Sequence, residues 1–176
     1  MNKYIVLVSV LALAIVAAAC APAPTPAPTP APTPVPVTEA NKALVRRYVE
    51  QVLIGGKLDS IGEFVSPDYK RYVSTTAAPL NAEGNKQRLA GLGAALPDKQ
   101  VTIDDIFAEG DRVAWRLTVR GTHQGVLQGI PPTGKAVTIT VIELARIENG
   151  KMAEHWGGPD TFNLLQQLGV TFAPAK

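Results

Sequence analysis

The spacing of apolar residues changes once along the chain, at Pro97, and this change limits the fold more than any other feature. Before Pro97, apolar residues recur at intervals of three and four, whereas after it they alternate with polar residues. The first spacing is typical of an amphipathic helix and the second of a strand with one buried face. Helices followed by hairpin-linked strands predict an α+β domain rather than alternating α/β units.

The helical part precedes Pro97. The elements predicted there are helices at 41–54, 57–65 and 81–96 and a brief extended piece at 69–73. Thr38 is suited to cap the first helix. The apolar face of this helix consists of Leu44, Val45, Tyr48, Val49 and Val52. These residues predict helices that pack one face against the strands.

The remaining part is predicted to form strands and one closing helix. The strands cover 101–106, 113–119, 137–142 and 151–156, and the helix covers 160–168 with Asp160 as its cap. Turns are expected at Gly110 and at Asn149-Gly150, a dipeptide that tolerates positive φ at both central positions. The predicted result is a curved antiparallel sheet wrapped around the N-terminal helices, with a pocket inside.

Residues 1–19 have the profile of a signal peptide. Lys3 is followed by an apolar stretch at 5–19 that is shorter than the roughly 20 residues needed to span a bilayer. The segment Val16-Ala17-Ala18-Ala19-Cys20 resembles the lipobox of bacterial lipoproteins, although Ala17 replaces the usual Leu. This resemblance implies that Cys20, the only cysteine, is lipidated. The alternative is an ordinary secretory signal with an incidental cysteine.

Residues 20–37 are expected to form the lipidated start and a proline-rich stalk. Repeated Ala-Pro and Thr-Pro pairs favour extended polyproline II, at about 3.1 Å per residue. We therefore expect an exported protein whose domain, residues 38–176, is held outside the cytoplasm by a lipid anchor in the membrane. The formal net charge is +2 and basic residues do not cluster, so the sequence does not favour a nucleic-acid partner.

Several short segments of the domain resemble the SnoaL-like polyketide cyclase and ester cyclase family, within the nuclear transport factor 2-like (NTF2-like) superfamily. The segments are Val45-Arg46-Arg47-Tyr48, Ser66-Pro67-Asp68-Tyr69, Gly121-Thr122-His123-Gln124-Gly125, Gly129-Ile130-Pro131-Pro132-Thr133-Gly134-Lys135, Glu154-His155-Trp156, Pro159-Asp160 and Leu165-Gln166-Gln167-Leu168-Gly169. Their order along the chain matches the order in the family. The resemblance implies a cone-shaped α+β fold.

The same resemblance implies an activity: proton transfer next to a carbonyl of a small hydrophobic compound, without a metal or another cofactor. In the cyclases, an Asp near the end of the last strand acts as general acid/base. That position corresponds to Gly157 here, and glycine cannot transfer a proton. A second site residue of the family, a His on the preceding strand, corresponds to Glu143.

Glu143 is the first candidate catalytic residue. By alternation it shares a side with Val137, Ile139 and Val141, so its carboxyl is expected to be buried. Desolvation would raise its pKa and make it an acid or base near neutral pH. The alternative is a position at the wetter end of the strand, or an ion pair with an Arg such as Arg116.

His123 and His155 are the other candidate catalytic residues. They are the only imidazoles in the chain, and their ordinary pKa suits proton transfer. His155 is predicted on the side of Gly157, and His123 at the mouth of the pocket. The alternative is that each fixes a loop or strand end by hydrogen bonding. Two His and one Glu at these spacings do not form a metal-ligand motif.

Three aromatic residues, Tyr48, Trp115 and Trp156, are candidates for ligand binding, and their alternative role is packing in the core. Two functions stay open: a cyclase-type or isomerase-type enzyme, and a non-catalytic surface lipoprotein that binds a small hydrophobic ligand. Protein interaction is a third class, in which the outer face of the sheet would form a homodimer.

Overall fold

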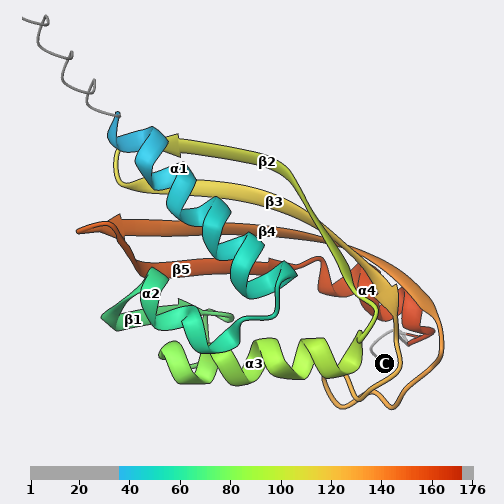
Figure 1. Cartoon of the computed structure of the whole chain (residues 1–176). Helices are drawn as coiled ribbons and strands as arrows, with labels where there is room; N and C mark the ends of the chain where they lie inside the picture. Colours follow the sequence, from blue (N-terminus) through green and yellow to red (C-terminus); the bar gives the residue numbers. More distant parts are fainter. Residues whose placement is uncertain (1–35, 172–176) are drawn as a thin grey trace, which may run out of the picture. The chain divides into compact units, whose positions relative to one another are not determined.

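The computed structural model describes residues 36–171, which form a five-stranded sheet with helices packed on it (Figure 1). The predicted signal peptide, Cys20 and nearly all of the predicted stalk lie outside the described residues. Within 36–171 most helices precede the hairpin-linked strands. One strand lies among these helices, and one helix follows the last strand. The predicted α+β class is confirmed.

The helical part begins earlier than predicted. Helix α1 (Val37–Tyr48) continues into a π-helical segment (Val49–Ile54), followed by a 3₁₀ turn (Leu58–Ser60), α2 (Ile61–Phe64) and α3 (Ala82–Ala95). Thr38 lies inside α1, so its predicted role as the cap is wrong. Pro36 precedes the helix instead, where its missing N–H costs no hydrogen bond. Asn81 caps α3 by accepting a hydrogen bond from the Gly84 N–H at 2.9 Å.

The sheet is mixed rather than wholly antiparallel. Its strands are β1 (Val65–Tyr72), β2 (Gln100–Glu109), β3 (Arg112–Thr122), β4 (Ala136–Glu148) and β5 (Lys151–Pro159), in the order β1-β5-β4-β3-β2. The pairs from β2 to β5 are antiparallel, as predicted, but β1 pairs with β5 in parallel. These two strands are far apart in sequence, so no hairpin turn imposes antiparallel pairing on them.

The last hairpin turn and the cap of the closing helix form as predicted. Asn149 and Gly150 have φ of 51° and 72°, and they connect β4 to β5. Asp160 caps α4 (Thr161–Leu168), its carboxylate accepting from the Asn163 N–H at 3.1 Å. These features depend on neighbouring residues only, which is why the sequence predicts them.

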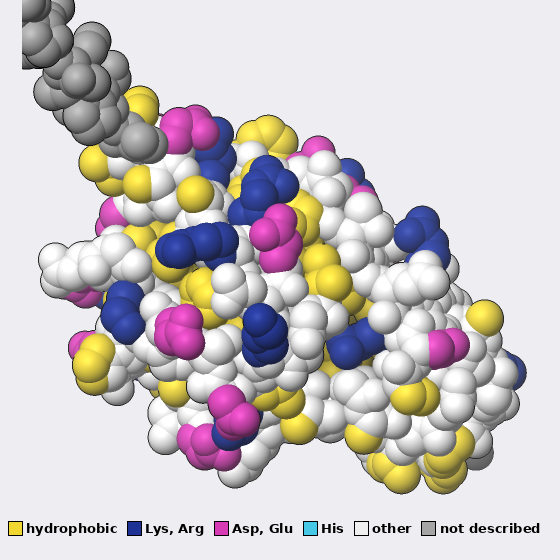
Figure 2. Space-filling view, in the orientation of Figure 1, with side chains coloured by type: hydrophobic (Ala, Val, Ile, Leu, Met, Phe, Trp, Pro, Cys, Tyr) yellow, Lys and Arg dark blue, Asp and Glu magenta, His cyan; other side chains and the backbone are white. Residues whose placement is uncertain are grey.

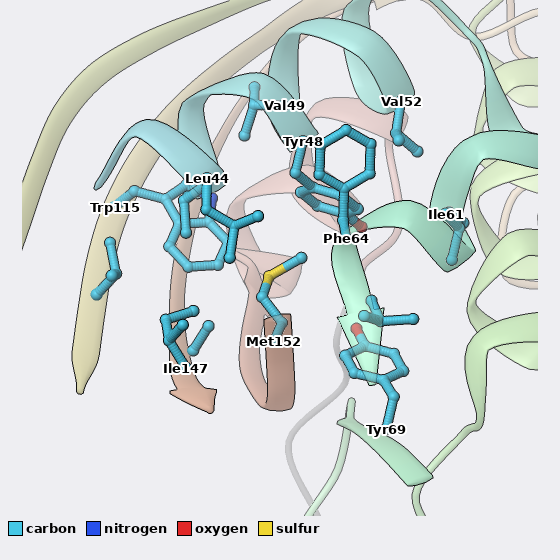
Figure 3. Packing of buried hydrophobic residues seen from close by; sticks show 14 of the residues in the cluster. Leu44, Tyr48, Val49, Val52, Ile61, Phe64, Tyr69, Trp115, Ile147 and Met152 are labelled. Atoms are coloured by element: carbon cyan, nitrogen blue, oxygen red, sulfur yellow. The ribbon is translucent and has the colours of Figure 1, made fainter. Parts of the chain in front are cut away.

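The core has two parts along the inner face of the sheet. One packs α1 and α2 against the sheet and includes Tyr48, Trp115 and Met152 (Figure 3). The other comprises Leu96, Val119, Val137, Ile139, Leu164 and Leu168, beneath α4. Members of both clusters line one cavity, which therefore lies where they meet.

Candidate active site

A cavity of about 460 Å³ opens among α3, β3, β4, the end of β5 and the loop around Leu127. This volume lies in the range of small-molecule sites. Most of its lining is aliphatic. Three lining side chains are charged: Arg71, Arg88 and Glu143. Among residues 36–171, no group of three or more His, Cys, Asp or Glu is placed to hold a metal ion.

The position of Glu143 follows from strand alternation. It points inward with Val137 and Ile139, as predicted, and only 5% of it is exposed. Its Oε1 accepts a hydrogen bond from Arg71 Nη2 at 2.6 Å. The predicted alternative of an ion pair with Arg116 is wrong, because Arg116 pairs with carboxylates on the other face of the sheet.

Arg71 is a site residue that the sequence analysis missed. It lies on β1 opposite His155 of β5, and its side chain is fully buried. Its Nη2 also donates to the Gly157 carbonyl at 3.1 Å. Alternation alone places Arg71 on the same side as Tyr69, which could have signalled burial. The partner could not be inferred, because it depends on the parallel pairing of β1 with β5.

The pKa of Glu143 is shifted in the direction opposite to the prediction. Burial raises it, but the contact with the His155 ring and attraction to the Arg71 and Arg88 guanidiniums outweigh burial and lower the pKa to about 2. The prediction of a raised pKa is therefore wrong, because neighbouring cationic groups dominate desolvation. Glu143 is a carboxylate at neutral pH.

His155 contacts Glu143 but does not line the cavity. Its Nδ1 is 2.8 Å from the Tyr69 hydroxyl, and its Nε2 is 3.4 Å from Glu143 Oε2. Burial lowers the pKa of His155 despite the opposing pull of the carboxylate, so the imidazole is neutral at neutral pH. Both contacts are served when the Tyr69 O–H donates to Nδ1 and the Nε2–H faces Glu143.

His123 belongs to a different part of the domain. It is fully buried just after β3, where its Nδ1 lies 3.0 Å from Thr133 Oγ1 and accepts from the Thr133 N–H at 3.3 Å. The backbone N–H of His123 donates to the Lys135 carbonyl at 2.9 Å. It does not line the cavity. Its observed contacts match the alternative role of fixing the loop that follows β3, and neither His is visible on the face in Figure 2.

The three candidate aromatic residues do not line the cavity either. Tyr48 and Trp115 are core residues, 1% and 2% exposed (Figure 3). The Tyr48 hydroxyl accepts from Asn85 Nδ2 at 3.3 Å, and burial raises its pKa to about 12. Trp156 stacks on Tyr72 with ring centroids 5.4 Å apart. Their placement matches packing rather than ligand contact.

Gly157 faces Glu143 across the β4–β5 pair and lines the cavity. Its φ is +111°, and a Cβ built there would lie 2.1 Å from the Ile142 carbonyl oxygen. An Asp therefore does not fit on this backbone. The position that the family resemblance links to acid/base catalysis therefore carries no proton-transferring side chain here, and its backbone conformation disfavours one.

The matching family model and two relatives of similar sequence are cyclases. The family model described as SnoaL-like polyketide cyclase matches residues 43–168. The nogalonic acid methyl ester cyclase of Streptomyces nogalater is 28% identical over 116 residues, which are 65% of this chain and 87% of the relative. The aklanonic acid methyl ester cyclase DnrD of Streptomyces peucetius is 32% identical, over 72% of this chain and 88% of the relative.

Solved structures share this fold. The crystal structure of AclR from Streptomyces galilaeus, described as a putative hydroxylase, has a TM-score of 0.67 at 34% identity, over 75% of this chain and 97% of AclR. That of IdmH from Streptomyces antibioticus has a TM-score of 0.65 at 30% identity, over 74% and 99%. Because the family model spans more than two thirds of the sequence, the chain belongs to the SnoaL-like polyketide cyclase family.

Proposed function

We propose that this domain is a cyclase-type enzyme that acts on a small hydrophobic carbonyl compound by proton transfer, with Glu143 as the proton acceptor. One observation carries the proposal: an ionised carboxylate forms part of the wall of an otherwise largely aliphatic cavity. The cyclase relatives support the same reaction class.

The chemistry needs no redox partner. Glu143 takes a proton from the carbon next to a carbonyl, and the electron pair of the broken C–H bond moves to the carbonyl oxygen, forming an enolate. The enolate carbon bonds to a second carbonyl carbon of the same molecule, and the resulting alkoxide takes the proton back from Glu143. His155 acts as a positioning residue, because its Nε2 faces Glu143 Oε2 at 3.4 Å.

The low pKa of Glu143 limits the substrate. A base is most effective when its pKa is near the working pH, and a carboxylate with a pKa of about 2 is a weak base. The substrate carbon must therefore be acidic already. A carbon between two carbonyl groups meets this requirement, so we expect a 1,3-dicarbonyl compound.

Proton abstraction can be tested without knowing the natural substrate. The full-length protein is incubated in D₂O with 2-acetyl-1-tetralone, a hydrophobic 1,3-diketone, and deuterium uptake at the central carbon is followed by mass spectrometry. We expect the wild type to accelerate exchange and Glu143→Gln to reduce the rate by about 100-fold. Glu154→Gln is the matched control, since Glu154 pairs with Arg146 away from the cavity.

A second function, binding without catalysis, is favoured by Gly157, whose backbone does not accept the family's Asp. Under this alternative the protein is a surface lipoprotein that holds a small hydrophobic ligand. It predicts that 2-acetyl-1-tetralone binds but that the wild type exchanges deuterium no faster than Glu143→Gln. That result would reject the enzyme.

We also propose that the chain is exported and anchored by a lipid on Cys20. The support comes from the sequence at 1–20 and the Pro-rich segment after it. The helices between residues 36 and 171 are all too short or too polar to cross a membrane. Mass spectrometry of the mature N-terminus tests the proposal: the expected product begins with diacylated Cys20, and a product beginning elsewhere without lipid would contradict it.

A further inference from the structure

The charges of the side chains that line the cavity do not sum to zero. Arg71 and Arg88 are cationic, whereas Glu143 is the single anionic side chain in the lining. Arg88 forms no ion pair with the described residues, and its Nε donates to Asn85 Oδ1 at 3.1 Å. His155, behind Glu143, is neutral at neutral pH. The cavity therefore has one excess positive charge.

Arg71 has hydrogen-bond donors to spare. Its Nη2 binds Glu143 and the Gly157 carbonyl, but its buried Nε and Nη1 have no hydrogen-bond partner among residues 36–171. A buried N–H without a partner is costly, particularly on a charged group. The planar guanidinium is also the side chain best suited to bind oxygen anions.

The rest of the cavity is apolar. Its walls include Leu53, Leu89, Leu117, Val119, Ile139 and Leu164. Such walls stabilise a hydrophobic body by excluding water from it, and the low local dielectric strengthens any ion pair formed at their edge. The complement of this cavity is a hydrophobic molecule with one negative charge.

We propose that the ligand carries an anionic oxygen, a carboxylate or an enolate, which binds between Arg71 and Arg88 while its apolar part lies against the aliphatic walls. The inference deepens the proposed function, because it names a property of the substrate of the same site. It rests on the cavity as a ligand site and not on turnover.

The test compares anionic and neutral probes of nearly equal shape. Binding of 2-naphthoate and of methyl 2-naphthoate to the full-length protein is measured by titration calorimetry at neutral pH. A second pair distinguishes the source of the charge: 2-phenyl-1,3-indandione, which ionises to an enolate, and its 2-methyl derivative, which cannot. We expect the anion of at least one pair to bind about 10-fold more tightly than its neutral partner.

Substitutions of charged residues that line the cavity should shift the preference for the anion in opposite directions. Arg88→Gln removes the excess charge and should abolish the preference for the anion. Glu143→Gln adds to the excess charge and should increase the preference. Arg116→Gln, which removes a charge on the outer face of the sheet, should leave it unchanged. A merely structural role of these residues would not produce changes of opposite sign.

Three results would overturn the proposal: equal binding of anion and neutral partner in both pairs, a preference unaffected by Arg88→Gln and Glu143→Gln, or no binding of any probe up to about 1 mM. Failure of the proposed function is a separate outcome. If the anion preference follows the cavity charge but deuterium exchange is not accelerated, the anion site is retained and the enzyme is rejected.

Discussion

The two faces of the sheet carry the same chemical groups in opposite surroundings. On the inner face, Arg71 Nη2 lies 2.6 Å from Glu143 Oε1, and the two side chains are 0% and 5% exposed. On the outer face, Arg116 reaches Asp104 at 3.1 Å and Asp105 at 2.5 Å, and the Arg116 side chain is 43% exposed. Distances alone would not distinguish these pairs.

Burial makes the difference between them. Water screens the outer cluster, which consists of Arg116, Asp104 and Asp105. Exposed ion pairs of this kind contribute little to stability. The inner pair has lost its hydration, so each charge depends on the other, and removing one leaves the other uncompensated. The same loss of water is the physical basis of the two proposed roles of this site, proton transfer and binding of an anion.

The largest expected effect is that of removing Arg71. Arg71→Met leaves the Glu143 carboxylate buried without its closest cation, and we expect the free energy of unfolding to fall by about 3 to 5 kcal/mol. Urea denaturation of the full-length chain measures it. The double variant Arg71→Met/Glu143→Met should recover much of the loss, because neither charge is then buried alone. A loss no greater than that of Arg116→Met would break the comparison.

Acid should weaken the inner pair specifically. The pKa of Glu143 is about 2 when folded, against an ordinary 4.5, so the unfolded chain takes up the proton first. This contribution is complete above about pH 4.5 and is lost as the pH falls toward about 2, by an amount on the order of 3 kcal/mol. The lowered pKa of His155 acts in the same direction, starting near its ordinary value of 6.5.

The measurement is the free energy of unfolding against pH for the wild type and Glu143→Gln. The difference between the two proteins should narrow as the pH falls from 4.5 toward 2, since Gln does not titrate. Parallel curves over that interval would show that Glu143 has an ordinary pKa and would contradict the assignment of the inner pair.

A substitution at Gly157 tests the backbone next to the inner pair, because the Gly157 carbonyl accepts a hydrogen bond from Arg71. In Gly157→Ala the new Cβ meets the Ile142 carbonyl oxygen at 2.1 Å, at a φ of +111°. We expect a loss of about 2 to 3 kcal/mol in thermal denaturation. Gly158→Ala is the neighbouring control, where a Cβ meets nothing within 4 Å. Equal stability of the two variants would contradict the close approach.

The smallest effect is expected on the outer face. Arg116→Gln should leave the urea midpoint unchanged within error, because its ion pairs are exposed to water. Raising the salt concentration should change little either, since the cluster is screened already. A loss comparable to that of Arg71→Met would show that the outer cluster contributes as much as the buried pair.

Much of the fold could be predicted from the sequence, because it depends on short-range patterns. The change of spacing at Pro97 predicts the α+β class, alternation predicts the inward side chain of Glu143, and Asn149 with Gly150 predicts the last hairpin. Each of these features depends only on residues that are close to one another in the sequence.

The candidate site could be predicted only in part. Alternation correctly brings Glu143 and His155 to the inner face. The aromatic residues Tyr48 and Trp115 are candidates for ligand contact or core packing from the sequence, and the structure places them in the core. A buried aromatic and an aromatic that lines a cavity have the same pattern in the sequence. Only the packing of α1 against the sheet distinguishes them.

By itself, the sequence determined the order of the main helices and hairpin-linked strands and the inward direction of side chains such as Glu143. The tertiary structure decided what those residues do there. Arg71 and Glu143 are 72 residues apart and meet because β1 runs parallel to β5. The pKa of a buried carboxyl depends on the charges that surround it in space, so the sequence could place Glu143 but not predict the direction of its shift.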